Sequence, residues 1–377
     1  MKRRDFLKYF AASAAGAGIL GLGRFKLTDK NNSRAGASGE ELKEAYYYRS
    51  KAGDEVECEL CFRGCNIPEG GSGFCRIRVN RNGTLYSQVY GRPSAVMADP
   101  IEKEPMHHFK PGSRILCIGT ASCNFRCKFC HNYHLSQRDI DEVNRVQDLS
   151  PKEAVSQAKD RGLPSMSFTY NEPTIFYEYM YDIAELAQEE DINIIFHTNG
   201  GLRREPLQDL LKNIDAVTVD LKAFTDEFYR DICQAELETV LESLQIIYEA
   251  GAWLEIVNLV LPDHNDNPEE IREMTAWIRD ELGAEVPLHF SRFMPSYQMT
   301  DLSPTPVETL EECHKIAVDQ GLKYVSIGNV PGHRANSSFC PECGERIIDR
   351  HHFTVNAVHI DEGRCSFCGA EISGVWR

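Results

Sequence analysis

The chain has 377 residues, of which 42% are hydrophobic and 26% are charged, a composition typical of a globular protein and not of a disordered or fibrous one. This length predicts one large domain together with one or two small ones. No stretch reaches the roughly 18 consecutive apolar residues that a membrane-spanning helix needs, so we expect no stable membrane span.

The first 37 residues predict a twin-arginine export signal. Arg3 and Arg4 precede a weakly apolar run over residues 9–23, and Ala35-Gly36-Ala37 offers a small-residue cleavage site. A flexible basic tail is the alternative. Residues 1–37 carry eight Lys and Arg against two Asp, a charge of +6, so the rest of a chain with net charge −16 carries −22. A body this acidic argues against a nucleic-acid partner.

From about residue 113 to 330, apolar runs of strand length alternate with helical patterns. Strands are expected at 114–118, 166–170, 194–197, 216–221, 254–261, 288–291 and 324–327. Helices are expected at 151–161, 174–190, 205–213, 236–250, 268–282 and 306–320, and Ser150-Pro151 and Asn267-Pro268 open two of them with an N-cap followed by Pro. Repeated strand-helix units predict an α/β fold with a parallel sheet and helices outside it, either open or curled as a barrel.

Polar residues follow several of these strands at the end where such folds bind ligands. They are Asn171 and Glu172 after the second strand, Asn199 after the third, Asp220 and Lys222 after the fourth, and His289 on the sixth. One such group is explained by a helix cap, but groups at the same end of consecutive strands predict a functional site.

Eleven of the 14 cysteines fall into three groups with short spacings. We name them the N-terminal quartet (Cys58, Cys61, Cys65 and Cys75), the three-cysteine loop (Cys123, Cys127 and Cys130) and the C-terminal quartet (Cys340, Cys343, Cys365 and Cys368). On a chain of this size, short clustered spacings indicate metal sites and not a disulfide framework. The remaining Cys117, Cys233 and Cys313 are most simply small buried hydrophobic residues.

The three-cysteine loop follows the first strand and supplies one thiolate fewer than a complete iron-sulfur cube requires. If the loop holds three irons of a 4Fe-4S cluster, the fourth iron is free to bind a substrate or cofactor, as a catalytic zinc keeps an open position. The alternatives are a zinc ion completed by His131 or Cys117, and a coincidence of spacing.

The two quartets predict further metal sites. The C-terminal quartet consists of two C-x2-C knuckles, which is the spacing of a zinc ribbon; its metal is expected to be structural zinc, with a rubredoxin-like iron as the alternative. The N-terminal quartet fits zinc or an auxiliary iron-sulfur cluster equally well, and disulfides are a third possibility in an oxidising compartment.

The spacing C-x3-C-x-aromatic-C, with Phe129 as the aromatic residue, resembles the radical S-adenosylmethionine (radical SAM) superfamily. The resemblance implies a partial (β/α)6 TIM-like barrel and a 4Fe-4S cluster whose open iron chelates SAM. It also implies reductive cleavage of SAM to a 5'-deoxyadenosyl radical, which abstracts hydrogen from a substrate, while the protein binds, orients and excludes water.

The same resemblance assigns cofactor contacts to individual residues. Phe129 falls near the adenine, Glu172 near the SAM amino group, Asn199 near the ribose, Asp220 and Lys222 beside the methionine carboxylate, and His289 at a SAM-contacting position. The family's Gly-Gly-Glu segment falls on Tyr170-Asn171-Glu172, so both glycines are replaced. Each residue also has a simpler interpretation: core packing for Phe129, a helix N-terminal charge for Glu172, a surface salt bridge for Asp220 with Lys222, and a satisfied core residue for His289.

Longer motifs narrow the resemblance. The stretch from Cys58 to Pro93, together with "DPIEKEP", "FTYNEPTIF", "VDLKAF" and "HFSRFMP", is similar to the radical SAM member of the AmmeMemoRadiSam system, a relative of pyruvate formate-lyase activating enzymes. AMMECR-type and Memo-like proteins are the partners that this resemblance implies. The predicted domains are a signal at 1–37, a four-cysteine segment at 45–105, the radical SAM core at 106–330 and a zinc ribbon at 335–377.

The function expected from these residues is a radical SAM enzyme of unknown substrate, with ferredoxin or flavodoxin as the low-potential electron donor. Two alternatives stay open: activation of a glycyl-radical enzyme of the pyruvate formate-lyase type, and a non-catalytic electron carrier or metal-dependent scaffold. The signal predicts export, whereas SAM and low-potential electrons are cytoplasmic, and the sequence does not resolve this conflict.

Overall fold

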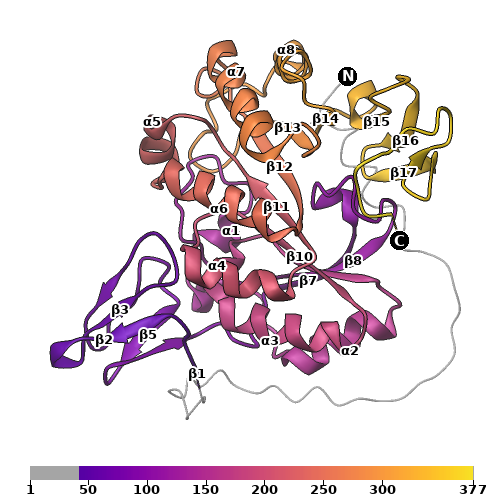
Figure 1. Cartoon of the computed structure of the whole chain (residues 1–377). Coiled ribbons are helices and arrows are strands. Elements are labelled where there is room, and N and C mark those ends of the chain that lie inside the picture. Colours follow the sequence, from indigo (N-terminus) through magenta and orange to yellow (C-terminus); the bar gives the residue numbers. More distant parts are fainter. Residues whose placement is uncertain (1–41, 377) are drawn as a thin grey trace, which may run out of the picture. The chain divides into compact units, whose positions relative to one another are not determined.

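The computed structural model describes residues 42–376, and the predicted export signal lies outside this range. An eight-stranded sheet with the order β14-β13-β12-β11-β10-β9-β8-β7 forms its centre (Figure 1). The strands are β7 (Ala95–Pro100), β8 (Arg114–Gly119), β9 (Ser165–Phe168), β10 (Asn193–Thr198), β11 (Ala216–Asp220), β12 (Trp253–Val260), β13 (Leu288–Arg292) and β14 (Val325–Gly328). Strands β8 to β14 are parallel, and β7 pairs antiparallel with β8 at one edge.

The helices follow the strands in alternation. They are α1 (Tyr133–Ser136), α2 (Pro151–Asp160), α3 (Tyr177–Gln188), α4 (Arg204–Leu210), α5 (Asp226–Phe228), α6 (Leu237–Ala250), α7 (Pro268–Trp277) and α8 (Val307–Asp319). Because successive parallel strands always step in the same direction across the sheet, right-handed crossovers place the helices on one face, as Figure 1 shows for α2, α3, α4 and α6. The predicted α/β fold with a mostly parallel sheet is therefore confirmed.

Local sequence signals explain where these elements begin. Ser150 Oγ accepts the backbone N–H of Glu153 at 3.3 Å and caps α2, while Asn267 Oδ1 accepts that of Glu269 at 2.8 Å and caps α7. The strands in the middle of the sheet are buried on both faces, which is the reason they read as continuous apolar runs.

The inner face of the sheet is filled by the segment between β7 and β8. Ile101, Met106 and Phe109 pack with Ile115 of β8 and with apolar residues of β10 and β11. The segment begins within the "DPIEKEP" motif at residues 99–105, which supplies Ile101, so the motif has a structural role beneath the sheet. Strand β7 was missed by the sequence analysis, because it is half-exposed along its length and carries an exposed methionine, Met97.

The N-terminal part consists of two small sheets, ordered β1-β6-β5 and β2-β3-β4. Their strands are β1 (Lys43–Glu44), β2 (Tyr48–Ser50), β3 (Val56–Cys58), β4 (Asn66–Ile67), β5 (Arg78–Arg81) and β6 (Thr84–Ser87). A fully buried ion pair joins this part to α3, with Arg78 Nη1 2.9 Å from Glu178 Oε1. Removal of either partner would leave a buried charge without its counterion.

The C-terminal part has a three-stranded sheet, β15-β16-β17, and a short ribbon, β18-β19. The strands are β15 (Ser338–Phe339), β16 (Arg346–His351), β17 (Thr354–Val358), β18 (Ile360–Asp361) and β19 (Arg364–Cys365). The backbone of Val375 pairs with the segment before β8: its N–H donates to His108 O at 2.7 Å and its carbonyl accepts from Lys110 N at 2.6 Å. The buried Arg350 donates a further hydrogen bond to His107 O.

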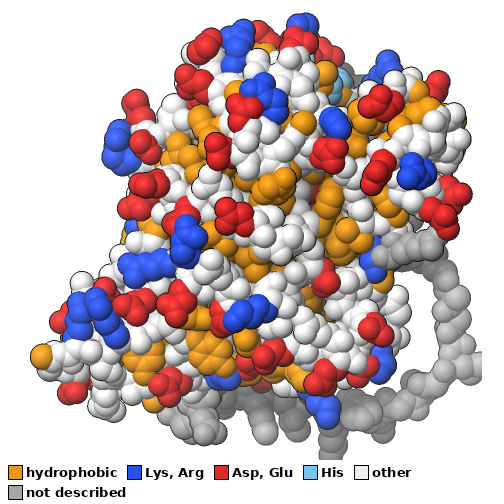
Figure 2. Space-filling view, viewed as in Figure 1, with side chains coloured by type: hydrophobic (Ala, Val, Ile, Leu, Met, Phe, Trp, Pro, Cys, Tyr) orange, Lys and Arg blue, Asp and Glu red, His pale blue; other side chains and the backbone are white. Residues whose placement is uncertain are grey.

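Short 3-10 and π turns complete the described chain. They are η1 (Ala52–Asp54), η2 (Ile101–Lys103), η3 (Ile140–Glu142), η4 (Pro173–Phe176), η5 (Leu211–Asn213), η6 (Tyr229–Cys233), η7 (Ile278–Leu282) and η8 (Arg334–Asn336). On the face drawn in Figure 2, acidic and basic side chains are interspersed and form no continuous basic patch. Within residues 42–376, no helix has the length and apolar character needed to cross a bilayer.

Candidate active site

A cavity of about 350 Å³ lies at the carboxyl ends of the parallel strands. All three cysteines of the three-cysteine loop line it. The residues predicted as cofactor contacts line the same cavity: Phe129, Asn171, Glu172, Asn199, Asp220, Lys222 and His289. Segments that are far apart in the sequence are thus brought together at the end of the sheet where ligands bind in this fold class.

Hydrogen bonds hold the three-cysteine loop against its neighbours. Cys123 Sγ accepts from the backbone N–H of Phe125 at 3.3 Å and from Asn199 Nδ2 at 3.6 Å, and Cys130 Sγ lies 3.1 Å from Ser136 Oγ. The backbone N–H of Lys128 donates to Ile232 O at 3.0 Å. Burial raises the pKa of Cys123 and of Cys130, so binding of a metal by these thiols must release protons.

The geometry of the loop does not fit a single zinc ion. Among residues 42–376, only the C-terminal quartet forms a group of three or more potential ligand atoms that all lie within 4.8 Å of one another. Cys117, proposed as a fourth zinc ligand, donates instead to Glu104 Oε1 at 3.2 Å and is absent from the cavity wall. His131 lies on the wall but completes no compact group with the cysteines. A cluster does not require its cysteine sulfurs to form one compact group, because each sulfur binds a different iron.

Glu172 is buried and fixes two loops at the edge of the cavity. Its Oε2 accepts the backbone N–H of Asn199 at 2.8 Å, and its Oε1 accepts from Thr198 Oγ1 at 2.8 Å and from Thr174 N at 3.0 Å. The bond to Thr174 caps η4, so the helix N-terminal interpretation of this carboxylate has a geometric basis. Burial nevertheless raises its pKa.

The two residues that replace the family's glycines also hold this edge in place. Tyr170 keeps a glycine-like backbone with φ of 70°, and its hydroxyl donates to Asp99 Oδ2 at 2.6 Å. Asn171 Oδ1 accepts from Thr120 N at 2.9 Å, and its Nδ2 donates to Ser122 O at 2.9 Å, directly before the three-cysteine loop. These contacts fix the backbone that leads to Glu172.

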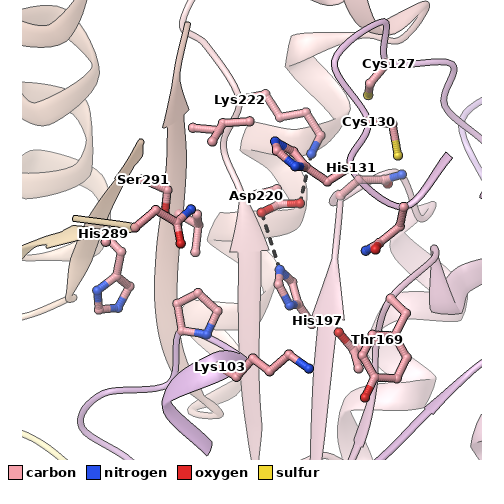
Figure 3. Close-up of a pocket in the computed structure, with 18 of the residues that line it drawn as sticks. Lys103, Cys127, Cys130, His131, Thr169, His197, Asp220, Lys222, His289 and Ser291 are labelled. Carbon is pink, nitrogen blue, oxygen red and sulfur yellow. Dashed lines mark hydrogen bonds and ion pairs between the residues drawn. The ribbon is translucent and has the colours of Figure 1, made fainter. Parts of the chain in front are cut away.

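Asp220 lies between two cationic groups, as Figure 3 shows. Its Oδ2 accepts from Lys222 Nζ at 2.9 Å, and its Oδ1 lies 3.4 Å from His197 Nε2. Burial lowers the pKa of His197, but the carboxylates of Asp220 and Glu104 outweigh burial and raise it to about 10. The Lys222 side chain is only 12% exposed, so the interpretation of Asp220 and Lys222 as a surface salt bridge is wrong.

His289 lies on the cavity wall with both ring nitrogens engaged. Nδ1 lies 2.6 Å from Ser326 Oγ, and Nε2 lies 2.6 Å from Glu255 Oε2. Glu255 also accepts the backbone N–H groups of His107 and His108 at 2.8 and 2.7 Å. The structure therefore gives His289 the contacts of a satisfied core histidine at the border of the cavity.

The Phe129 side chain is buried from solvent and also lines the cavity. Its ring lies 6.0 Å from that of Phe228, and Lys222 Nζ lies 5.8 Å from its centroid. Both the packing interpretation and a place beside a flat ligand are compatible with these contacts.

Several cavity residues were not predicted as site residues. Lys103, His107 and His197 belong to the wall, and His352 and Phe353 reach it from the C-terminal part. Glu104 contacts one of these wall residues: its Oε2 lies 3.4 Å from His197 Nδ1. The sequence signal for these residues was the "DPIEKEP" motif, which contains Lys103 and Glu104. Only the fold reveals that Glu104 faces His197.

The two quartets differ in geometry. In the C-terminal quartet, Cys340 Sγ lies 3.7 Å from Cys368 Sγ, and Cys343 Sγ lies 3.8 Å from Cys365 Sγ. The N-terminal quartet lines a separate small cavity and forms no comparably compact group. All of these cysteines are free thiols, so disulfides within the quartets are absent from the described chain.

Comparison with known proteins identifies the family. Residues 117–278 match the radical SAM superfamily. An uncharacterised protein of Methanocaldococcus jannaschii is 42% identical over 333 residues, which cover 88% of this chain and 99% of the relative. The chain belongs to the radical SAM superfamily.

Within this superfamily, the protein is related to pyruvate formate-lyase-activating enzymes. The enzyme of Clostridium pasteurianum is 22% identical over 221 residues, covering 54% of this chain and 90% of the relative. Pyruvate formate-lyase 1-activating enzyme of Escherichia coli is 25% identical over 227 residues, covering 56% and 92%. A solved domain of pyruvate-formate lyase-activating enzyme from Bacteroides vulgatus aligns with a TM-score of 0.38 at 20% identity, over 43% of this chain and 98% of that domain.

Proposed function

We propose that this radical SAM protein is an enzyme that binds a 4Fe-4S cluster through Cys123, Cys127 and Cys130 and cleaves SAM reductively to act on a substrate. One observation carries the proposal: the three thiols share a single cavity with the polar residues from the ends of β9 to β11. An electron carrier or scaffold has no need of such a cavity, and it would leave Glu172 and Lys222 at the surface, whereas both are buried or nearly so.

The residues of the cavity fit SAM as well as a cluster. The bound cluster and SAM would together supply a 5'-deoxyadenosyl radical, which removes a hydrogen atom from the substrate. Lys222 offers an ammonium group to the methionine carboxylate, and Asp220 holds that ammonium group at 2.9 Å. Asn199 binds both Glu172 and Asn124, so it links the nucleotide side of the cavity to the three-cysteine loop.

The enzyme's own side chains also control water in the cavity. Phe129 and Phe125 on the wall are buried, and burial of the neighbouring polar groups strengthens their interactions with a charged ligand. Exclusion of water around a reactive radical is the contribution that a protein makes to cofactor chemistry of this kind.

The direct test is anaerobic reconstitution with iron and sulfide, followed by addition of dithionite and SAM. We expect formation of 5'-deoxyadenosine and methionine by the wild-type enzyme and none by Cys127→Ala. Failure of a protein with a fully assembled cluster to form 5'-deoxyadenosine would contradict the proposal.

A second candidate function is activation of a glycyl-radical enzyme. It is supported by the similarity to pyruvate formate-lyase-activating enzymes and by the Asp220-x-Lys222 pair on the cavity wall. The test is electron paramagnetic resonance of a mixture with a pyruvate formate-lyase-type protein and SAM. A glycyl radical signal supports this function, and 5'-deoxyadenosine formation without any such signal favours another substrate.

For the C-terminal quartet we propose a structural zinc ion. Four thiolates at about 2.3 Å from a tetrahedral zinc lie about 3.8 Å from one another, close to the observed 3.7 and 3.8 Å. A single iron ion would fit the same tetrahedron, so metal analysis of the purified protein is the deciding measurement.

We also propose that the protein is the radical SAM member of the AmmeMemoRadiSam system. The motifs between Cys58 and Trp376 support this assignment, and AMMECR-type and Memo-like proteins are the partners it predicts. Ferredoxin or flavodoxin is the proposed electron donor. Co-purification of tagged protein with either partner type would support the assignment, and equal recovery from an untagged control would count against it.

A further inference from the structure

The N-terminal quartet gathers around one enclosed cavity that is separate from the active-site cavity. All four cysteines line it. Cys58 ends β3, Cys61 and Cys65 lie in the turn before β4, and Cys75 follows the turn after β4. Four thiols from the end of one strand and from two successive turns thus line one cavity, which the sequence spacing alone did not establish.

The distances within the N-terminal quartet separate it from a zinc site. A Cβ placed on Gly73 would lie 3.8 Å from both Cys65 Sγ and Cys75 Sγ, so these two sulfurs stand at most twice that distance apart. Yet no three sulfurs of this quartet lie within 4.8 Å of one another, unlike those of the C-terminal quartet. Within the described residues, the three-cysteine loop likewise forms no such compact group.

A single ion and a cluster require different arrangements of their sulfurs. Sulfurs that share one tetrahedral ion are neighbours at about 3.8 Å, whereas sulfurs that each bind a different iron of a cluster stand farther apart. Within one chain, the C-terminal quartet thus has the spacing of a single-ion site, whereas the three-cysteine loop, for which we propose a cluster, does not. The N-terminal quartet resembles the cluster site.

The surroundings of the quartet also suit an anionic cluster. Cys65 Sγ accepts the backbone N–H of Phe74 at 3.4 Å. The guanidinium groups of Arg63 and Arg126 lie 3.5 and 4.2 Å from the Phe74 ring centroid. Cationic groups and backbone N–H donors next to the sulfurs stabilise the negative charge of thiolate-bound iron-sulfur centres.

The same two arginines join the quartet to the three-cysteine loop. Arg63 Nε donates to Asn124 O at 2.7 Å, and Arg126 donates to Phe74 O and to Cys123 O, both at 2.6 Å. Asn124 lines the quartet's cavity, while its neighbour Cys123 lines the active-site cavity. The two cysteine sites are therefore adjacent and connected by hydrogen bonds.

We propose that Cys58, Cys61, Cys65 and Cys75 bind a second 4Fe-4S cluster next to the active site. This site is independent of the proposed reaction, because it uses none of the residues that line the active-site cavity. With four protein ligands, the cluster has no open iron, so it does not bind SAM.

The experiment compares iron, zinc and acid-labile sulfide in anaerobically reconstituted proteins. Wild type is expected to contain about eight sulfides per chain, and Cys123→Ala/Cys127→Ala/Cys130→Ala about four, because each cluster contributes about four. Sulfide is the decisive quantity, since a single iron or zinc ion in the C-terminal quartet brings none. Electron paramagnetic resonance of the reduced triple variant should show a cluster signal that SAM does not change.

Reciprocal variants and a control complete the test. Cys58→Ala/Cys61→Ala should keep about four sulfides and a cluster signal that SAM does change. Cys313→Ala, a buried cysteine of α8 outside all three groups, should match wild type. About four sulfides in wild type together with none in the triple variant would overturn the proposal, as would zinc bound by the N-terminal quartet. Absence of SAM cleavage in a protein with both clusters would instead contradict the proposed function alone.

Discussion

Glu172 and Asn199 are joined by a hydrogen bond of 2.8 Å from the backbone N–H of Asn199 to Oε2 of the buried carboxylate. Asn199 in turn donates through Nδ2 to Asn124 Oδ1 at 2.8 Å. A carboxylate that follows β9 therefore determines the position of the loop after β10, and this loop supports the three-cysteine loop. Glu172 is a positioning residue even before any contact with SAM is considered.

The first prediction concerns Glu172→Gln. The glutamine side chain has one acceptor oxygen where glutamate has two. Its NH2 group would therefore face the backbone N–H of Asn199, which is also a donor. We expect a loss of about 1–3 kcal/mol in the free energy of unfolding, measured with urea, and weaker SAM binding by calorimetry. Glu189→Gln, at the exposed end of α3, is the matched control and should change neither quantity. Unchanged stability of Glu172→Gln would show that the hydrogen bond to Asn199 contributes little.

The second prediction concerns the pH dependence of stability. The folded pKa of His197 is raised from its ordinary 6.5 to about 10. A raised pKa means that the protonated histidine stabilises the fold fully below about 6.5, and that this contribution is lost as the pH rises through 10. The free energy of unfolding of wild type should therefore exceed that of His197→Gln most at low pH, and the difference should shrink across this window.

Urea unfolding of both proteins at several pH values measures this difference, because the other titrating groups are common to the two. His264→Gln, at an exposed position after β12, serves as the control. A constant difference from pH 6.5 to pH 10 would mean that His197 does not change its charge in this range.

Local signals account for the parts of the fold that were predicted. The expected strand at 114–118 corresponds to β8, and the expected helix at 236–250 to α6, because buried parallel strands and capped amphipathic helices leave clear patterns. The contact between Glu104 and His197, which are 93 residues apart, leaves no such pattern in the sequence. It depends on how the segment before β8 fills the inner face of the sheet, which only the folded chain reveals.

The cysteine groups show the same division between local and tertiary information. Cysteine spacing was sufficient to identify three groups, because ligands of one site cluster in the sequence. It was not sufficient to distinguish a cluster from a single ion in the N-terminal quartet, because that difference lies in distances between sulfurs. Those distances are set by turns such as the one at Gly73, which leaves room between Cys65 and Cys75.

The third prediction concerns Lys222→Met. Loss of a partly buried ammonium group should weaken SAM binding about tenfold or more, because a hydrogen bond to a charged group contributes roughly 1.5–3 kcal/mol. Decarboxylated SAM lacks the carboxylate that Lys222 is proposed to bind, so its affinity should change much less. Calorimetry with both ligands measures the difference. Lys212→Met removes an exposed lysine that also pairs with an aspartate and is the control. An equal loss of affinity for both ligands would assign Lys222 a structural role only.

The fourth prediction concerns the C-terminal quartet. Cys340→Ser/Cys365→Ser removes the two buried cysteines of the proposed zinc site, and a unit this small would depend on its metal for most of its stability. We expect loss of about one zinc per chain and at least tenfold faster proteolysis within residues 337–376. Because His352 and Phe353 reach the active-site cavity from this part, SAM cleavage should also slow. Ser366→Ala changes an exposed residue between two ligands and should leave zinc content, proteolysis and cleavage as in wild type. Intact protease resistance after complete loss of zinc would show that the strands β15 to β19 are stable without the metal.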